Sequence, residues 1–353
     1  MNLLTIGLTV KIKTDFETLK TEESIIIGRV ALEHKRMYRI WTEQGELLGE
    51  ISGKFSFQAQ GRDDFPAVGD WVMVKPRIAE GKGTITAVLP RQSKFSRKMA
   101  GNTTEEQIVA ANVDTVFLVN SLNEDLNLRR IERYLLLAWE SGANPVIVLS
   151  KADLCPNILG KIAEVETVTF GSVPIVPVSA EHGEGLEGLE PYLQPGKTVA
   201  LLGSSGVGKS TLTNCLLGQK KQLVQEIRQS DDKGRHTTTH REMIMLSNGS
   251  ILIDTPGMRE LQLWESPDGL SETFSEIEEL ASLCKYRDCG HHDEPGCAVI
   301  GAIREGQLSP ERLTSYHKLQ KELAYLERKA DKRAQTEEKR RWKSITKQVR
   351  SKK

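Results

Sequence analysis

The residues from Gly203 to Ser210 have the types and spacing of a phosphate-binding loop. Their sequence, GSSGVGKS, matches the pattern G-x-x-x-x-G-K-[S/T], in which backbone N–H groups surround phosphates. Lys209 would neutralise charge on the β- and γ-phosphates, and the Ser210 hydroxyl would bind Mg²⁺. The pattern stands between an apolar run, TVALLG, and a helical run, STLTNCLLG, so a bound phosphate would lie at a helix N-terminus. The candidate phosphate-binding residues are Gly203, Ser204, Ser205, Gly206, Val207, Gly208, Lys209, Ser210 and Thr211.

Two further segments could complete a site for magnesium and a γ-phosphate. Asp254 ends the apolar run SILID, so its carboxylate could hold Mg²⁺ through water, and the N–H of Gly257 could meet the γ-phosphate. The segment GRHTTT lies between the phosphate loop and Asp254, where nucleotide switches carry a threonine that completes the Mg²⁺ shell. We expect Thr238 to be this ligand, with Thr237 and Thr239 as alternatives.

The side chain that would orient an attacking water is not a glutamine here. The position that follows Asp254-Thr-Pro-Gly257 holds Met258, which cannot hydrogen-bond a nucleophile, so unstimulated hydrolysis should be slow. His236, in the GRHTTT segment, is the nearest candidate to place that water once a partner fixes the loop. The alternative is a solvated loop histidine with no role in catalysis.

The segment Ser150-Lys151-Ala152-Asp153 resembles the [N/T]-K-x-D reader of guanine. Asp153 can accept hydrogen bonds from the ring N–H and the exocyclic amine of guanine, which adenine cannot present together, while the Lys151 stem covers the base. Adenine would leave that carboxylate unpaired, at a cost in affinity. Ser179 and Ala180 resemble the companion loop whose backbone N–H meets the guanine carbonyl. Ser150 departs from the usual Asn or Thr, which could lower guanine affinity; by itself, the segment would be read as a solvent-facing turn.

A cluster of cysteine and histidine residues has the spacing of a structural zinc site. Cys284, Cys289, His291 and Cys297 offer a Cys3His set of soft ligands with no open position for catalysis. His292 is the rival to His291, and reduced cysteines packed in a small helical unit are the zinc-free alternative.

The elements that must position these residues alternate between strand and helix. Apolar runs at VDTVFLVNSL, NPVIVLS, PIVPVSA, TVALLG and SILID alternate with helical patterns, which predicts a parallel α/β sheet with its ligands at the carboxyl ends of strands. The base-reading segments precede the phosphate loop, whereas an ordinary GTPase begins with that loop. The order therefore indicates a circularly permuted P-loop GTPase domain, which is possible because chain termini commonly lie close together.

The regions on either side of this domain have different patterns. Short β-rich runs broken by Gly and Pro predict an N-terminal OB-type β-barrel, although an SH3-like barrel would give almost the same pattern. The Cys/His region is mainly helical, and the overall fold class is multidomain α/β. The predicted parts are an N-terminal extension at 1–22, the barrel at 23–95, a linker at 96–110, the permuted GTPase domain at 111–267, the helical zinc-binding domain at 268–325 and a basic tail at 326–353.

Composition limits the class of protein and its partners. The chain of 353 residues is 38% hydrophobic and 27% charged, which is typical of a soluble globular protein, and no run suits a membrane span or a secretory signal. We therefore expect a cytoplasmic monomer without membrane contact. Residues 327–353 hold twelve Lys or Arg against four Asp or Glu, and Trp342 lies among them. This end suits an arm that orders on RNA, with a solvated charged tail as the alternative.

These motifs in this order resemble the ribosome small-subunit-dependent GTPase A family (RsgA, also called YjeQ or YloQ). The segments that carry the resemblance are GSSGVGKST, GRHTTTHRE, DTPG and CKYRDCGHHDEPGC. The resemblance implies an oligonucleotide-binding barrel, a permuted GTPase domain and a zinc domain, acting in late maturation of the small ribosomal subunit, which stimulates GTP hydrolysis. It also implies a catalytic role for His236, zinc ligation by Cys284, Cys289, His291 and Cys297, and the small subunit with its rRNA, GTP and GDP as partners.

Two other functions fit parts of the sequence. An RNA-binding module with a decayed nucleotide site would explain Met258 and Ser150, but Lys209, Ser210 and Asp254 argue against it. A metal-regulated ATPase would use the same phosphate loop, but the guanine-reading carboxylate predicted above opposes it.

Overall fold

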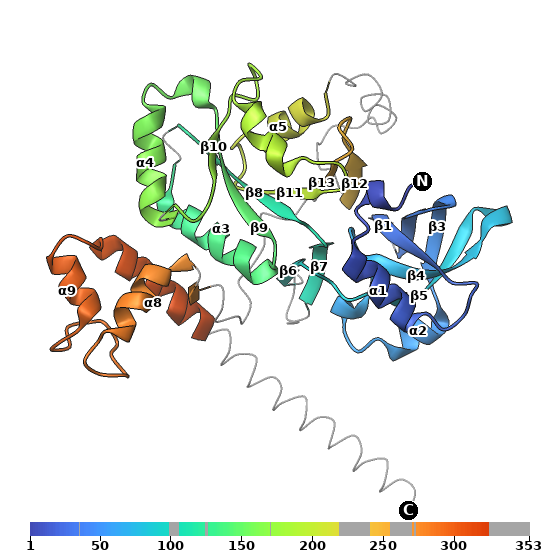
Figure 1. The fold of residues 1–353 in the computed structure, drawn as a ribbon, viewed down its shortest axis with the longest axis horizontal. Helices are drawn as coiled ribbons and strands as arrows, with labels where there is room; N and C mark the ends of the chain where they lie inside the picture. The colour runs from blue at the N-terminus through green and yellow to red at the C-terminus, as the bar shows by residue number, and fades with distance from the viewer. Residues whose placement is uncertain are drawn as a thin grey trace, which may run out of the picture. The chain divides into compact units, whose positions relative to one another are not determined.

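The computed structural model describes residues 1–34, 36–98, 106–123, 126–169, 171–218, 241–254, 270–271 and 273–324. The chain divides into two compact units, residues 1–262 and 263–353. The first contains the barrel and the GTPase domain, and the second contains the Cys/His region (Figure 1). His236, Thr238 with its neighbours Thr237 and Thr239, Gly257 and Met258 lie outside the described residues, as does the basic tail.

A closed barrel of five strands follows the N-terminal segment. Its strand order is β1-β2-β3-β5-β4, with β4 pairing back to β1 and β3 running parallel to β5, which is the OB arrangement. Apolar side chains from the strands fill the barrel, and Val30, Tyr38, Ile40 and Leu47 are in its core. The bounds are β1 Ile26–His34, β2 Met37–Thr42, β3 Gly45–Ile51, α2 Gly53–Gln58, β4 Trp71–Arg77 and β5 Lys82–Val88. The predicted OB-type barrel is confirmed.

A parallel sheet forms the centre of the GTPase domain. Strands β10, β9, β8, β11 and β13 are adjacent in that order and parallel, and β12 pairs antiparallel with β13. Every residue of β8 and β11 is buried, as expected for strands with both faces covered. The bounds are β8 Thr115–Ser121, α3 Leu128–Ser141, β9 Asn144–Ser150, α4 Ile158–Thr169, β10 Ile175–Pro177, β11 Thr198–Leu202, α5 Lys209–Leu216, β12 Arg241–Met245 and β13 Ile251–Asp254.

The segment expected to be a linker contains paired strands. Strand β6, Lys94–Lys98, pairs antiparallel with β7, Glu106–Ala111. At its end, Ala111 lies against Gly69, which has φ +93°; a Cβ there would stand 2.0 Å from the Ala111 carbonyl oxygen. The barrel and the GTPase domain are thus in backbone contact at this point.

The N-terminal segment is folded and is part of the first unit. Helix α1, Val10–Leu19, begins at Thr9, whose side chain accepts from the Ile12 N–H, and buries Ile12 and Phe16. Ahead of it, Ile6 is fully buried, and its carbonyl oxygen accepts a hydrogen bond from Arg29 of the barrel at 2.7 Å.

The second unit is helical. Helix α8, Ser275–Ser282, helix α9, Ala298–Arg304, and helical residues 310–324 enclose a small core. Four apolar side chains of the last helix are buried, namely Leu313, Tyr316, Leu319 and Leu323. Arg312 is 3% exposed in its side chain and pairs with Glu276 at 2.6 Å, so this core also includes an ion pair.

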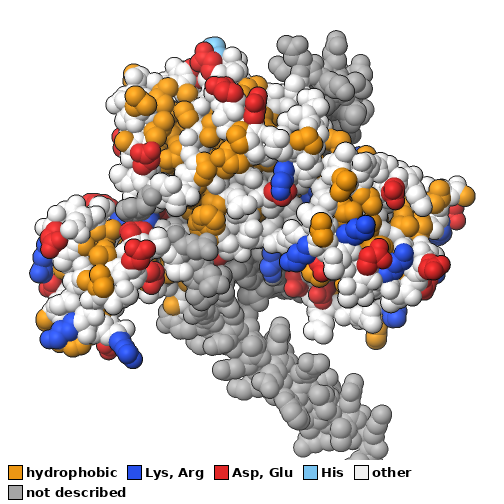
Figure 2. Space-filling view, viewed as in Figure 1, with side chains coloured by type: hydrophobic (Ala, Val, Ile, Leu, Met, Phe, Trp, Pro, Cys, Tyr) orange, Lys and Arg blue, Asp and Glu red, His pale blue; other side chains and the backbone are white. Residues whose placement is uncertain are grey.

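Charged side chains of both signs lie on the face of the barrel that Figure 2 shows. On the face of the barrel in Figure 2, Lys and Arg side chains lie among Asp and Glu, so neither sign dominates there. No described helix has the length and apolar character needed to cross a membrane.

Candidate functional site

The predicted nucleotide-binding residues follow neighbouring strands of one sheet. Ser179 and Ala180 come after β10, Ser150 ends β9, Gly203 follows β11, and Asp254 ends β13. Because these strands are parallel, their carboxyl ends share one edge of the sheet. The fold therefore brings the base-reading segments, the phosphate loop and the end of β13 to the same edge.

The phosphate loop passes close to the neighbouring strand β8. A Cβ on Gly203 would stand 2.4 Å from the Val119 carbonyl oxygen, so only glycine fits this position. The Lys209 ammonium donates hydrogen bonds to the carbonyl oxygens of Gly203 and Ser204, both at 2.6 Å. The lysine charge is thereby held beside the first two residues of the loop.

One buried polar atom in the loop has no protein partner among the described residues. The Ser204 hydroxyl is shielded from solvent, and no hydrogen bond to it occurs in that part of the chain. Such an atom is costly unless a ligand or water satisfies it. The Ser204 hydroxyl without a protein partner, the Gly203 backbone without a side chain over it and the positive charge of Lys209 all suit an anionic ligand such as a nucleotide phosphate.

Ser150 joins the base-reading segment to the phosphate loop. Its side chain is 2% exposed, and its hydroxyl lies 2.5 Å from the Val207 carbonyl oxygen and 3.3 Å from that of Asn120. A hydroxyl has one proton, so the shorter contact to Val207 is the donated bond. Ser150 therefore links the predicted base-reading segment to the predicted phosphate loop.

The Asp153 carboxylate is exposed at the same edge. Lys151 has φ +57°, a left-handed conformation that turns the chain sharply after β9, and the Ala152 N–H donates to the Val178 carbonyl oxygen at 3.1 Å. A hydrogen bond from Ser179 is the main cause that holds the pKa of Asp153 below its usual 3.8. The carboxylate is therefore ionised at neutral pH and can accept two N–H donors.

The residues expected to contact magnesium are only partly described. Asp254 closes β13 opposite Glu242 of β12, which places its backbone beside the phosphate-loop strand. The orientation of its side chain, and the whole of His236, Thr238 and Gly257, lie outside the described residues.

The four predicted metal ligands form one cluster in the second unit. The ligand atoms of Cys284, Cys289, His291 and Cys297 all lie within 4.8 Å of one another. Two sulfur atoms, of Cys284 and Cys297, are 3.9 Å apart, and His291 Nδ1 lies 3.7 and 3.5 Å from them. Ligands about 2.3 Å from a central ion at tetrahedral angles would be separated by similar distances, so the set fits a metal ion.

The backbone around the cluster also supports a metal-binding arrangement. The Ala298 N–H lies 3.4 Å from Cys284 Sγ, and the Ile300 N–H lies 3.4 Å from Cys297 Sγ, so amides face the sulfurs as they would face thiolates. His292 takes no part: it is exposed, and its ring packs on His317 with centroids 4.6 Å apart. Of the two candidate histidines, the one brought to the cysteines is His291.

A loop carboxylate holds the ligand-bearing turn. Glu294 accepts from the N–H groups of Gly290 at 3.0 Å, His292 at 2.8 Å and Asp293 at 3.2 Å. Backbone amide donors, its own and that of His292 first, lower the pKa of Glu294 to about 2. This residue was missed at the sequence level, where an acidic residue between two ligands and next to Pro-Gly was the available signal.

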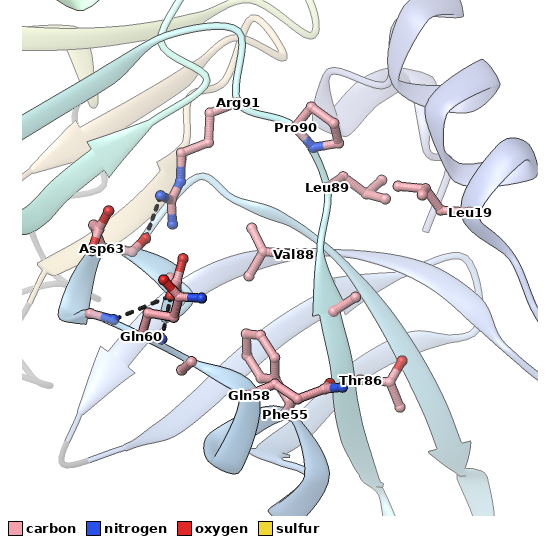
Figure 3. A pocket seen from close by; sticks show the side chains of 14 residues that line it. Leu19, Phe55, Gln58, Gln60, Asp63, Thr86, Val88, Leu89, Pro90 and Arg91 are labelled. Atoms are coloured by element: carbon pink, nitrogen blue, oxygen red, sulfur yellow. Dashed lines mark hydrogen bonds between the residues drawn. The ribbon is translucent and has the colours of Figure 1, made fainter. Parts of the chain in front are cut away.

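A separate pocket of about 940 Å³ opens on the barrel (Figure 3). Leu19, Phe55 and Val88 give it an apolar wall. Arg91 closes one side, where its guanidinium makes a paired contact with the buried Asp70 at 2.7 and 2.8 Å and donates to the Asp63 carbonyl oxygen at 2.6 Å. The positive charge of Arg91 is therefore already paired with polar groups of the barrel region.

Comparison with known proteins decides the family. The sequence model described as RsgA GTPase matches residues 88–264, and one described as a 50S ribosome-binding GTPase matches residues 198–332. A protein of Lactiplantibacillus plantarum named small ribosomal subunit biogenesis GTPase RsgA 2 is 48% identical over 325 residues, covering 92% of this chain and 90% of that protein. The chain belongs to the RsgA GTPase family. It is therefore a GTP hydrolase, as the motifs predicted.

Other relatives agree with this assignment. The RsgA of Opitutus terrae is 48% identical over 332 residues, covering 92% of this chain and 90% of that protein. The crystal structure of YjeQ from Thermotoga maritima matches with a TM-score of 0.65 and 32% identity, over 85% of this chain and 99% of that one. The structure of YloQ, described as a circularly permuted GTPase, matches in fold with a TM-score of 0.62 and 22% identity, over 86% of this chain and 98% of that one. The predicted family and fold class are confirmed.

Proposed function

We propose that this RsgA-family GTPase acts in biogenesis of the small ribosomal subunit, with the subunit and its rRNA as partners. The observation that carries the proposal is the similarity along nearly the whole chain to proteins named for that role, 48% identical over 92% of the chain. The barrel adds support, because OB folds commonly bind oligonucleotides. We further propose that the protein works in the cytoplasm as a monomer.

The phosphate loop is proposed to bind the triphosphate of GTP. Backbone N–H groups and the Ser204 hydroxyl would meet phosphate oxygens, and Lys209 would move from loop carbonyls toward the β- and γ-phosphates. Bound Mg²⁺ would neutralise charge on the β- and γ-phosphates. The proposed phosphate and magnesium contacts are Gly203, Ser204, Ser205, Gly206, Val207, Gly208, Lys209, Ser210, Thr211, Thr238, Asp254 and Gly257.

Guanine recognition is proposed for the loops after β9 and β10. Asp153 would accept both guanine donors, the Lys151 stem would cover the ring, and the Ala180 N–H would donate to the guanine carbonyl. Ser150 contributes by fixing the base segment to the phosphate loop, and Ser179 contributes by binding Asp153.

Hydrolysis is proposed to use His236 to place the attacking water. The support is chemical, because Met258 offers no hydrogen bond where many GTPases carry a glutamine. Changing His236→Ala should leave GTP binding nearly intact and should lower stimulated turnover; unchanged turnover would return this histidine to a solvated-loop role.

Structural zinc is the proposed occupant of the Cys3His cluster. Three sulfur ligands and one imidazole nitrogen are the donor set that suits zinc, and all four positions are taken by protein. We keep the predicted division into barrel, permuted GTPase domain and zinc domain at 23–95, 111–267 and 268–325 as part of this proposal, with 96–110 between the first two and 326–353 as an RNA-binding arm.

The direct test is GTP turnover with and without purified small subunits. We expect slow turnover alone and strong stimulation by small subunits, with none by large subunits. A Lys209→Ala variant is the control for contaminating GTPases and should show no stimulation. Absence of stimulation at saturating small subunit would refute the ribosomal role, while the basal GTPase activity would stand.

A further inference from the structure

The loop after β10 makes a tight turn that contains an exposed histidine. Ser179 and Glu184 exchange backbone hydrogen bonds at 2.9 and 3.1 Å, which closes the turn over the residues between them. Within this turn, His182 Nδ1 lies 3.1 Å from the Ser179 hydroxyl oxygen, and the His182 N–H lies 3.4 Å from the same atom. Ser179 itself is 1% exposed, so its hydroxyl depends on these protein partners.

Counting donors around this hydroxyl assigns the direction of each hydrogen bond. A serine hydroxyl has one proton and two lone pairs. The Asp153 carboxylate can only accept, and the hydrogen bond from Ser179 is the main cause that lowers its pKa. Directed to Asp153, the Ser179 proton leaves His182 Nδ1 as the donor in its 3.1 Å contact with the Ser179 oxygen. His182 thus contacts Ser179, and the hydrogen bond of 3.1 Å from the Ala152 N–H to the Val178 carbonyl oxygen keeps the Asp153 loop beside Ser179.

We propose that His182 is a positioning residue for guanine recognition, acting on the Asp153 carboxylate through the Ser179 hydroxyl. The inference rests on the proposed role of Asp153. An exposed carboxylate can rotate about its side-chain bonds, and one that accepts two guanine N–H groups at once must be held in a single orientation. A hydroxyl whose lone pairs are occupied by His182 can point its proton in one direction only, which fixes that orientation.

The test compares two nucleotides in variants of position 182. Inosine diphosphate lacks the exocyclic amine of guanine, so the ratio of GDP to IDP affinity reports how well Asp153 reaches both donors. His182→Ala and His182→Gln should weaken GDP binding about three- to tenfold, within the range of one hydrogen bond, and should weaken IDP binding less. His182→Asn should restore wild-type discrimination, because its amide nitrogen can stand where Nδ1 stands. Glu181→Ala, on the same turn, is the matched control and should change neither affinity.

A double-mutant cycle separates this role from a structural one. If His182 acts through Ser179, adding His182→Ala to a Ser179→Ala variant should cause no further loss of discrimination. Equal losses of GDP and IDP affinity in His182→Ala, or an undiminished effect in the Ser179→Ala background, would overturn the proposal. If the wild-type protein itself bound GDP no better than ADP, the guanine-reading role of Asp153 would fail instead, so the two failures are distinguishable.

Discussion

Arg29 is expected to be the residue whose loss most directly loosens the first unit. Its side chain is 1% exposed and donates to carbonyl oxygens of three segments, at 2.7 Å to Ile6, 3.2 Å to Gly69 and 2.9 Å to Asn112. These belong to the N-terminal segment, the barrel and the start of the GTPase domain. The guanidinium also lies 5.4 Å from the Trp71 ring. The planar guanidinium of Arg29 thus connects three parts of the chain by hydrogen bonds.

The loss of stability on replacing Arg29 can be worked out from these contacts. In an Arg29→Met variant the Gly69 oxygen keeps the Asn112 side-chain donor, at 3.1 Å, but the Ile6 and Asn112 oxygens lose theirs, at about 1–3 kcal/mol each. Loss of the cation–π contact adds about 1 kcal/mol. Burial lowers the Arg29 pKa to about 10 from 12.5, so relief from burying the charge returns about 3 kcal/mol. We expect the free energy of unfolding of the Arg29→Met variant to fall by about 2 kcal/mol.

Arg29→Lys should destabilise the unit more than Arg29→Met does. A lysine keeps the cost of burying a charge, yet a single ammonium cannot reach three carbonyl oxygens in a fixed fork. Urea unfolding followed by tryptophan fluorescence measures the loss, and proteolysis within residues 1–22 should become faster. Arg39→Met is the control: its side chain is 44% exposed in surface ion pairs, so it should cost below about 1 kcal/mol. A lysine variant as stable as wild type would show that a point charge suffices and would refute this reasoning.

Three further predictions concern the nucleotide and metal sites. Ser150→Ala removes the 2.5 Å bond to Val207 and should weaken GDP binding about fivefold in a fluorescence titration, with a loss of stability of about 1–3 kcal/mol. Because the folded-state pKa of Asp153 is lowered, its proposed guanine contact should be present above pH 3.8 and should be lost as pH falls through the lower folded value; Ser179→Ala should move this acid limb of GDP affinity upward. Cys289→Ser should reduce the metal bound by the cluster, measured by elemental analysis, and should lower the unfolding temperature of the second unit, while GDP affinity stays unchanged.

Local patterns in the sequence were sufficient for much of the fold and of the site. The phosphate loop could be predicted because strand, glycine loop and helix follow one another within nineteen residues, 198–216, so the spacing alone defines the geometry. The barrel could be predicted as a class but not distinguished from its SH3-like alternative. That distinction depends on the parallel pairing of β3 with β5, which joins residues more than thirty positions apart.

Contacts between distant segments explain what the sequence did not reveal. The 1–22 segment was predicted only as an extension, and its attachment to the barrel depends on the hydrogen bond between Arg29 and Ile6, which no local pattern signals. Likewise, the sequence alone does not show which of His291 and His292 lies beside the cysteines. The turn at Gly290 and Glu294 decides between them, because it directs one ring to the cysteines and the other to His317.

The sheet explains why a permuted chain can keep an ordinary nucleotide site. The site needs β10, β9, β11 and β13 to end at one edge, and that requirement concerns their order in space rather than along the chain. Permutation leaves this edge of the sheet unchanged but alters which elements follow one another along the chain. Strand β12 pairs with β13 on one side and with β1 of the barrel on the other, where Glu242 also meets Arg39 at 3.0 Å. The strand beside Asp254 therefore belongs to both domains, so a shift of β13 has a direct mechanical path to the barrel.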